Sequence, residues 1–290
     1  MTPSKFIIGS AQFGLNYGIS NEQGKVKEIE INKILATARK NNIFTIDTAK
    51  AYGSAEQVLG RLAKKNTLKF ITKISPPKQD EKIKDYILRS KFEIKESLRL
   101  LNIEHFDAVL IHNASVLKSK IRGPLINFLK KLKSDNITKK IGISLYEPEE
   151  VLLFKDLSPD LVQVPLNLFD QRFLVSGVIE SLHSKGIEIH ARSVFLQGLL
   201  LMKPKSLPEN LSELYQPLKE MLYFFNEKEV SVLSEAISFV YNQKLVDKVI
   251  LGVTNHKELI DCLNFNESTL EKDYERFAID DYKLIDPRRW

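Results

Sequence analysis

Short apolar runs alternate along the chain with longer segments of helical period. Each run is too short for a typical helix, and most are rich in Ile and Val, which favours β-strands. Their nearly continuous hydrophobicity is typical of strands that are buried on both faces of a parallel sheet. The predicted strands are residues 6–10, 43–47, 69–73, 107–112, 140–144, 161–166, 187–193 and 248–253.

The segments between these runs show the signals of amphipathic helices. Apolar residues recur at helical spacing across residues 81–101. A second helix is predicted from Pro124, because proline is favoured at the first helical position. Pro148, followed by Glu149 and Glu150, indicates an acidic helix start. The order of strand and helix repeats through the chain.

Repeated strand–helix units predict an α/β protein, a closed (β/α)8 TIM barrel that forms a single domain over residues 1–290. An open doubly wound sheet is the structural alternative. It is disfavoured because the first strand ends in GSAQFG and no GxGxxG motif follows it. The longest gap between predicted elements, residues 198 to about 228, indicates a binding loop or lid after the seventh strand.

Composition and charge narrow the possible partners. The 290 residues suit one such barrel, and 43% hydrophobic with 28% charged residues is a globular composition. The net charge of +6 comes from dispersed lysines, so no nucleic-acid track is expected. No long uncharged apolar stretch and no signal peptide are visible, which predicts a cytoplasmic protein without a membrane partner. We expect a monomer or a weak oligomer.

Metal and disulfide chemistry are not expected either. The single cysteine, Cys262, excludes an intrachain disulfide, and we interpret it as a small helix residue rather than a reactive thiol. The histidines form no HxxxH pair, and no cluster of possible ligands has the spacing of a metal site.

Ionisable residues stand at or just after the ends of three successive predicted strands. Asp47 ends the second, Tyr52 follows in the turn, Lys73 ends the third and His112 ends the fourth. Each has a structural explanation when it is taken alone, such as a helix cap, a core ring, a solvent-reaching amine or a core histidine. Because the carboxyl ends of neighbouring strands lie together in a barrel, we expect the four side chains to converge.

The four residue types suit the transfer of a proton to a carbonyl oxygen. A tyrosine has an ordinary pKa near 10, and a nearby ammonium favours the phenolate and is expected to lower that pKa. A carboxylate would hold the ammonium, and a histidine would donate a hydrogen bond to the substrate oxygen. Such general acid catalysis contributes about 10²- to 10⁴-fold. The carbonyl carbon also needs a hydride, which no side chain supplies, so a nicotinamide cofactor is implied.

The stretch IDTAKAYGSAEQVLG, residues 46–60, resembles the aldo-keto reductase signature DTA-x-x-YG-x-x-E. FITKIS resembles the third strand of that family and DAVLIHN its fourth, and the resemblance extends over essentially the whole chain. It implies that Asp47, Tyr52, Lys73 and His112 are the catalytic tetrad of an NAD(P)H-dependent oxidoreductase, with Tyr52 as proton donor.

The resemblance also implies a cofactor site in which some positions differ from the family. Ser144 matches a serine that contacts the nicotinamide amide, but Leu145 stands where the family often has Asn. Arg192 replaces an aromatic residue that stacks on the nicotinamide, and a planar guanidinium can also stack. The residues assigned to the cofactor are Ser10, Ser144, Gln163, Arg192, Ser193, Phe195, Gln197, Gly198, Gly252, Val253, Thr254, Glu258, Asp261 and Cys262.

The choice between the two nicotinamide dinucleotides depends on the segment after the eighth strand. NADPH is the expected cofactor, and NADH is the alternative. The Arg or Lys that often binds the 2′-phosphate is absent at Thr254 and Asn255, although His256 and Lys257 are nearby. Glu258 would accept a hydrogen bond from a ribose hydroxyl and would repel a phosphate.

The substrate is expected to be a small carbonyl compound. Gln12, Phe13, Asn16 and Tyr17 follow the first strand and are candidates to line its pocket. The tail residues 288–290, Arg-Arg-Trp, are expected either to close over a substrate that carries a phosphate or carboxylate, or to pack as a surface tail. SAQFGLNYGISN is similar to a bacterial branch found with surface-polysaccharide genes, which favours a sugar derivative.

Two other functions remain as alternatives to a reductase. One is a cofactor-binding regulatory barrel with little turnover, which an intact tetrad disfavours. The other is a lyase or epimerase that uses Lys73 as a Schiff-base amine, which a carboxylate partner at Asp47 disfavours.

Overall fold

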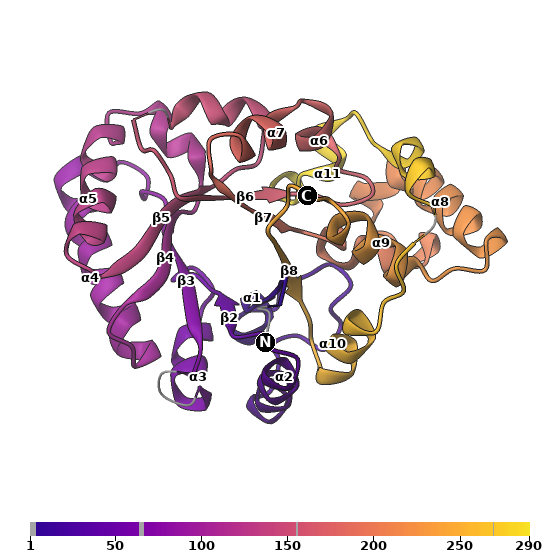
Figure 1. Cartoon of the computed structure of the whole chain (residues 1–290), viewed down its shortest axis with the longest axis horizontal. Helices are drawn as coiled ribbons and strands as arrows, with labels where there is room; N and C mark the ends of the chain where they lie inside the picture. Colours follow the sequence, from indigo (N-terminus) through magenta and orange to yellow (C-terminus); the bar gives the residue numbers. More distant parts are fainter. Residues whose placement is uncertain (1–3, 64–66, 155, 269) are drawn as a thin grey trace.

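The structure, a computed structural model, describes residues 4–63, 67–154, 156–268 and 270–290. Its strands form a closed parallel barrel in the order β1 to β8, and β8 pairs with β1. Helices surround the strands, and the late helices α8, α9 and α10 gather on one side (Figure 1). The predicted (β/α)8 TIM barrel is confirmed. In the described part of the chain, no helix has both the length and the hydropathy needed to cross a membrane.

Each of the predicted strands is present, with boundaries that differ by up to two residues. Pairing ends one residue early after Gly9 and starts late at Thr45, whereas the fifth strand begins two residues before its predicted start. The strands are β1 Phe6–Gly9, β2 Thr45–Asp47, β3 Lys69–Ile74, β4 Phe106–Ile111, β5 Thr138–Ser144, β6 Leu161–Pro165, β7 Glu188–Arg192 and β8 Lys248–Gly252.

The helices fall into full α-helices and short 3₁₀ segments. The α-helices are α1 Ala11–Gly14, α2 Glu28–Lys40, α3 Ala55–Leu62, α4 Ile83–Leu101, α5 Arg122–Ser134, α6 Arg172–Val175, α7 Val178–His183, α8 Tyr215–Glu227, α9 Val232–Tyr241, α10 His256–Leu263 and α11 Tyr282–Ile285. The 3₁₀ segments are η1 Ala114–Lys118, η2 Pro148–Leu153, η3 Leu196–Leu201, η4 Pro204–Ser206, η5 Glu209–Leu214, η6 Glu271–Phe277 and η7 Pro287–Arg289.

Three helix predictions had different outcomes. The helix over residues 81–101 is confirmed as α4, whereas α5 begins two residues before Pro124. Pro148 opens the 3₁₀ segment η2 rather than an α-helix, although Glu147 and Glu150 form a capping box there. The prediction of a loop over 198–228 is wrong, because α8 occupies much of it and buries Leu218, Met221 and Phe225.

The barrel interior contains an apolar layer under a polar rim. Lys73 follows Ile71 by two residues, and Gln163 follows Leu161 by two, so the members of each pair point to the same side of their strand. The polar side chains therefore stack above the apolar ones at the carboxyl ends of the strands. The apolar layer consists of Ile7, Ile71, Ala108, Leu110, Leu161 and Ile250.

Candidate active site

A cavity of about 700 Å³ lies at the carboxyl ends of the strands, a size typical of cofactor and small-molecule sites. Asp47, Tyr52, Lys73 and His112 all line it, so the predicted convergence occurs. They come from the ends of β2, β3 and β4 and from the turn between β2 and α3.

The buried ion pair of Asp47 and Lys73 is the centre of this group. Lys73 Nζ lies 2.5 Å from Asp47 Oδ2, and the two side chains are only 2% and 6% exposed, respectively. The ammonium also donates to the carbonyl oxygen of Thr48 at 3.1 Å and lies 3.3 Å from Tyr52 Oη. The Gln163 amide donates to Asp47 Oδ1 at 2.6 Å. Carboxylate, amine and phenol therefore form one continuous chain of contacts.

The turn that carries Tyr52 is shaped by two glycines. A side chain at Gly14 would meet the carbonyl oxygen of Tyr52 at 1.9 Å, so α1 packs directly on the Tyr52 backbone. Gly53 has a φ of 56°, in the left-handed region that glycine tolerates best. The glycine that follows Tyr52 in the sequence motif is thus explained by the left-handed backbone conformation at Gly53.

Glu56 connects the Tyr52 turn to the strand that carries Lys73. Its carboxylate accepts from Thr72 Oγ1 at 3.1 Å and from Ser97 Oγ at 2.7 Å, while the side chain is buried. Burial raises the pKa of Glu56, and these hydrogen bonds oppose that rise. Because Thr72 precedes Lys73, these contacts fix α3 against β3 and hold the phenol beside the ammonium.

His112 stands beside the phenol as a neutral imidazole. Its ring meets the Tyr52 ring edge to face, with centroids 5.8 Å apart. Burial lowers the pKa of His112 to about 3, and the positive charges of Lys73 and Arg192 add to the effect. A neutral imidazole has one N–H to donate, so His112 is able to hydrogen-bond a carbonyl oxygen at neutral pH.

The pKa of Tyr52 differs in direction from the expectation. Burial raises it well above its ordinary value, and the negative charge of Asp47 adds to the rise. The positive charge of Arg192 acts in the opposite direction, but it does not offset this rise in the pKa. Tyr52 therefore keeps its proton at neutral pH, as a proton donor must.

Comparison with known proteins gives the family. The profile of the aldo/keto reductase family matches residues 5–280. The chain belongs to the aldo/keto reductase family. It is accordingly an NAD(P)H-dependent oxidoreductase, and members of the family act on small carbonyl compounds. A search of curated protein sequences found no significant match.

Solved structures of other aldo-keto reductases have the same fold. An aldo-keto reductase from Bacillus halodurans, in its holo form, is 17% identical with a TM-score of 0.72, over 98% of this chain and 96% of that one. A glycerol dehydrogenase from Gluconobacter oxydans is 20% identical with a TM-score of 0.69, over 96% of this chain and 92% of that one. At these identities the likeness establishes the fold.

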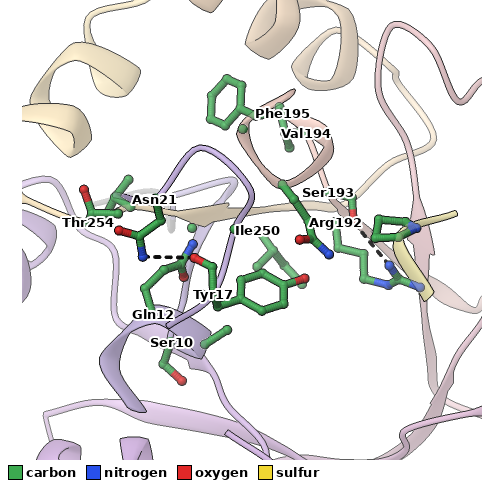
Figure 2. Close-up of a pocket in the computed structure, with 18 of the residues that line it drawn as sticks. Ser10, Gln12, Tyr17, Asn21, Arg192, Ser193, Val194, Phe195, Ile250 and Thr254 are labelled. Carbon is green, nitrogen blue, oxygen red and sulfur yellow. Dashed lines mark hydrogen bonds between the residues drawn. The ribbon is translucent and has the colours of Figure 1, made fainter. Parts of the chain in front are cut away.

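Most of the positions that this aldo-keto reductase was expected to use for its cofactor line the cavity. Figure 2 shows Thr254, Asn21 and Gln12 on one side, Arg192 and Ser193 on the other, and the ring of Tyr17 between them. The expected cofactor residues among the lining are Ser10, Ser144, Arg192, Ser193, Phe195, Gln197, Gly198, Gly252, Val253, Thr254, Glu258 and Cys262.

The residues that line the cavity suit a polar ligand. Ser10 Oγ and Arg192 Nε are buried without a hydrogen-bond partner, and both residues line the cavity. Buried polar atoms are normally paired, so such atoms beside a cavity indicate groups that a bound molecule satisfies. Within the described residues, no group of three or more His, Cys, Asp or Glu side chains is arranged to hold a metal ion.

Four expected positions lie elsewhere. Phe13 is fully buried in the core and does not line the cavity, so the prediction of a substrate contact there is wrong. Asn16 and Asp261 are exposed and are not among the residues that line the cavity. Gln163 is fully buried beneath the rim, where its amide binds Asp47 rather than facing the cavity.

Tyr146 is a lining residue that the sequence did not indicate. Its ring has the Arg192 guanidinium at 4.2 Å and the Arg288 guanidinium at 3.7 Å from its centroid. Arg192 also donates to the carbonyl oxygen of Leu145 at 2.8 Å, while the Leu145 side chain is buried in the core. The only available signal was the position of Tyr146, two residues beyond the end of β5.

The C-terminal tail lies partly at the cavity and partly on the surface. Arg288 lines the cavity and is held by the Asp286 carboxylate at 2.6 Å. Arg289 packs on the ring of Tyr282, and the Trp290 indole donates to the carbonyl oxygen of Leu284 at 3.2 Å. Neither Arg289 nor Trp290 is part of the cavity lining.

Proposed function

We propose that the protein reduces the carbonyl group of an aldehyde or ketone, such as a sugar derivative, to the alcohol, with Tyr52 as the proton donor. The observation that carries this proposal is the 3.3 Å contact between Tyr52 Oη and Lys73 Nζ at the wall of the cavity, beside His112. A small substrate with hydroxyl groups suits the polar side chains of Tyr17, Tyr146 and Arg288 that line the same cavity.

The four side chains divide the work of protonation. The substrate oxygen accepts hydrogen bonds from Tyr52 and from the neutral His112, which polarise the carbonyl group. As negative charge develops on that oxygen, the phenol gives up its proton, and the Lys73 ammonium stabilises the phenolate that remains. Asp47 holds Lys73 in place, and solvent restores the proton of Tyr52. The nicotinamide, when bound, supplies the hydride to the carbonyl carbon.

The cavity provides groups to hold such a cofactor along its length. Ser10, Ser144 and Arg192 lie at the strand ends near the tetrad, where polar atoms without partners suit the nicotinamide amide. Ser193, Val194, Phe195, Gln197 and Gly198 line another part, and Thr254 with Glu258 lines the part formed by α10. Lys73 is not available for a Schiff base, because its amine is bound by Asp47 and by the Thr48 carbonyl.

Replacement of Tyr52 by Phe tests the proposal. We expect turnover of test aldehydes to fall by about 10²- to 10⁴-fold because the proton donor is lost, while affinity for the nicotinamide cofactor stays unchanged. The measurement is the loss of reduced-nicotinamide absorbance over a panel of carbonyl compounds, with cofactor affinity from calorimetry. Tyr223→Phe, an exposed tyrosine on α8, is the matched control and should keep full activity.

Two outcomes would contradict the proposal. Equal turnover in Tyr52→Phe and the wild type would mean that the proton comes from another group. A wild-type protein that binds the cofactor but turns over no carbonyl compound in either direction would favour the regulatory barrel instead.

A further inference from the structure

The part of the cavity formed by α10 has a different charge from the catalytic part. Thr254 and Glu258 line it, and Figure 2 shows Thr254 on the side away from Arg192. The nicotinamide must lie beside Tyr52, because the hydride and the proton go to the same carbonyl group. The adenosine half of a bound dinucleotide would then lie away from the tetrad, where Thr254 and Glu258 line the cavity.

The carboxylate of Glu258 is fixed in this part of the cavity. Its Oε2 accepts from the Thr254 backbone N–H at 2.7 Å, and its Oε1 accepts from Thr254 Oγ1 at 2.6 Å and from Asn255 Nδ2 at 2.8 Å. A carboxylate has about four acceptor positions, so one remains free on Oε2. The start of α10 thus holds a negative charge of its own.

None of the described residues places a Lys or Arg side chain in this part of the cavity lining. Among the described lining residues, the Lys and Arg side chains are Lys73, Arg192 and Arg288, and all three lie at the catalytic part, near Tyr52 or Tyr146. His256, at the start of α10, gives both its backbone N–H and its Nδ1 to the Glu30 carboxylate. Lys257 is exposed and does not line the cavity.

Several backbone N–H groups at the start of α10 are also bound by side chains of this chain. The Asn255 side chain accepts from the Glu258 backbone N–H at 2.9 Å and so caps the helix. Helix starts bind phosphate groups through free N–H donors and positive potential. Here the N–H groups of Thr254, His256 and Glu258 already donate to side chains of this chain, and the adjacent carboxylate opposes the positive potential.

We propose that Glu258 makes this protein select NADH over NADPH. The proposal rests on the proposed function. The free acceptor position on the Glu258 carboxylate suits a hydroxyl of the adenosine ribose, whereas a 2′-phosphate at the same place would meet a fixed negative charge with no cation to offset it. This reverses the preference for NADPH that the family resemblance implied.

The test is the affinity of the protein for each dinucleotide, measured by calorimetry without any carbonyl substrate. We expect the wild type to bind NADH about tenfold or more tightly than NADPH, because like charges held together are costly. Glu258→Gln keeps the size and one acceptor oxygen but removes the charge, so it should narrow this ratio mainly by strengthening NADPH binding. The gain in NADPH affinity should also shrink at high salt, since screening weakens charge repulsion.

Glu180→Gln is the matched control. It makes the same chemical change at an exposed position on α7, outside the cavity lining. We expect it to leave the NADH-to-NADPH ratio unchanged, and unchanged melting temperatures would show that both variants fold. Equal or tighter binding of NADPH by the wild type would overturn this inference alone. Failure of the wild type to bind either dinucleotide would overturn the proposed function with it.

Discussion

Two carboxylate–lysine pairs lie at different depths of the barrel. Asp47 and Lys73 form the pair at the catalytic rim, while Glu188 and Lys140 form a pair near the starts of β7 and β5. Each carboxylate has a second neighbour: the Gln163 amide donates to Asp47, and His190 Nε2 lies 2.8 Å from Glu188. The chemistry of the two pairs is therefore nearly the same.

The surroundings of the two pairs differ. The side chains of the Asp47–Lys73 pair are at most 6% exposed, whereas Lys140 is 37% and Glu188 23% exposed. Burial of an ion pair has a desolvation cost that its attraction often fails to offset, and an exposed pair has little cost or gain. The costly pair is the one that contacts Tyr52 and lines the cavity. The difference indicates that the rim pair is retained for chemistry and the lower pair for local order.

The largest expected effect comes from breaking the rim pair. Lys73→Met should lower turnover by about 10²- to 10⁴-fold, since the phenolate loses its stabilising charge. It should also cost about 3–5 kcal/mol of the free energy of unfolding, because Asp47 would be left buried without its cation. Steady-state kinetics and denaturant unfolding measure the two effects.

A matched pair of variants sharpens this prediction. Lys140→Met should leave turnover unchanged, because that lysine does not line the cavity. The double variant Asp47→Asn with Lys73→Met should recover part of the lost stability without any activity. If Lys140→Met reduced turnover as strongly as Lys73→Met, the functional distinction between the pairs would be lost.

A smaller effect is expected when acid protonates Glu188 and so weakens its pair with Lys140, which should lower the free energy of unfolding. Burial alone would raise the pKa of Glu188, but the hydrogen bonds from His190 and Lys140 outweigh it and lower the value from 4.5 to about 2. The stabilisation from this group is therefore complete above pH 4.5 and is lost as the pH falls toward 2.

Glu188→Gln tests this linkage. We expect a loss of about 1–3 kcal/mol in the free energy of unfolding at neutral pH, and the gap to the wild type should close on acidification. Denaturant unfolding over a pH series measures it, with the exposed Glu180→Gln on α7 as control. A gap that stayed constant down to the lowest pH would show that the charge of Glu188 contributes nothing.

The smallest expected effect is that of pH on turnover. His112 is neutral above a pKa of about 3, and the pKa of Tyr52 is raised well above 10.0, so neither group titrates near neutrality. We expect kcat for carbonyl reduction to change by less than about threefold over about pH 5 to 8. A fall in rate with a midpoint inside that interval would mean that one of the two groups has a different charge from the one described.

The sequence was sufficient for the barrel and for the convergence of the tetrad. Parallel strands place their carboxyl ends at one rim, so the ends of β2, β3 and β4 bring their side chains together whatever the detailed packing is. The helix α8 was missed because the whole gap from residue 198 to about 228 was interpreted as one loop, although its second half carries apolar residues at Leu218, Met221 and Phe225. The spacing of these three residues, three and then four positions apart, is itself helical and could have predicted α8 from the sequence.

Other features of the site could be established only from the interatomic distances in the structure. The direction of the Tyr52 pKa depends on the balance between burial and two opposite charges, which no spacing of residues gives. The amide of Gln163 reaches Asp47 although 116 residues separate them. Phe13 was predicted to contact the substrate, but it is fully buried in the core. An aromatic residue just after a strand can pack either into the core or toward a ligand, and the sequence does not distinguish the two.

The lack of a side chain at Gly14 has a consequence for the redesign of this enzyme. The segment after β1 lines the cavity through Gln12 and Tyr17. Through Gly14, the same segment packs against the backbone of Tyr52. Grafting a new stretch here to alter substrate choice would also shift the phenol unless position 14 stayed without a side chain. Changes in this segment that alter substrate specificity would therefore also alter the reaction rate. Mutant libraries of the segment should keep Gly14 unchanged.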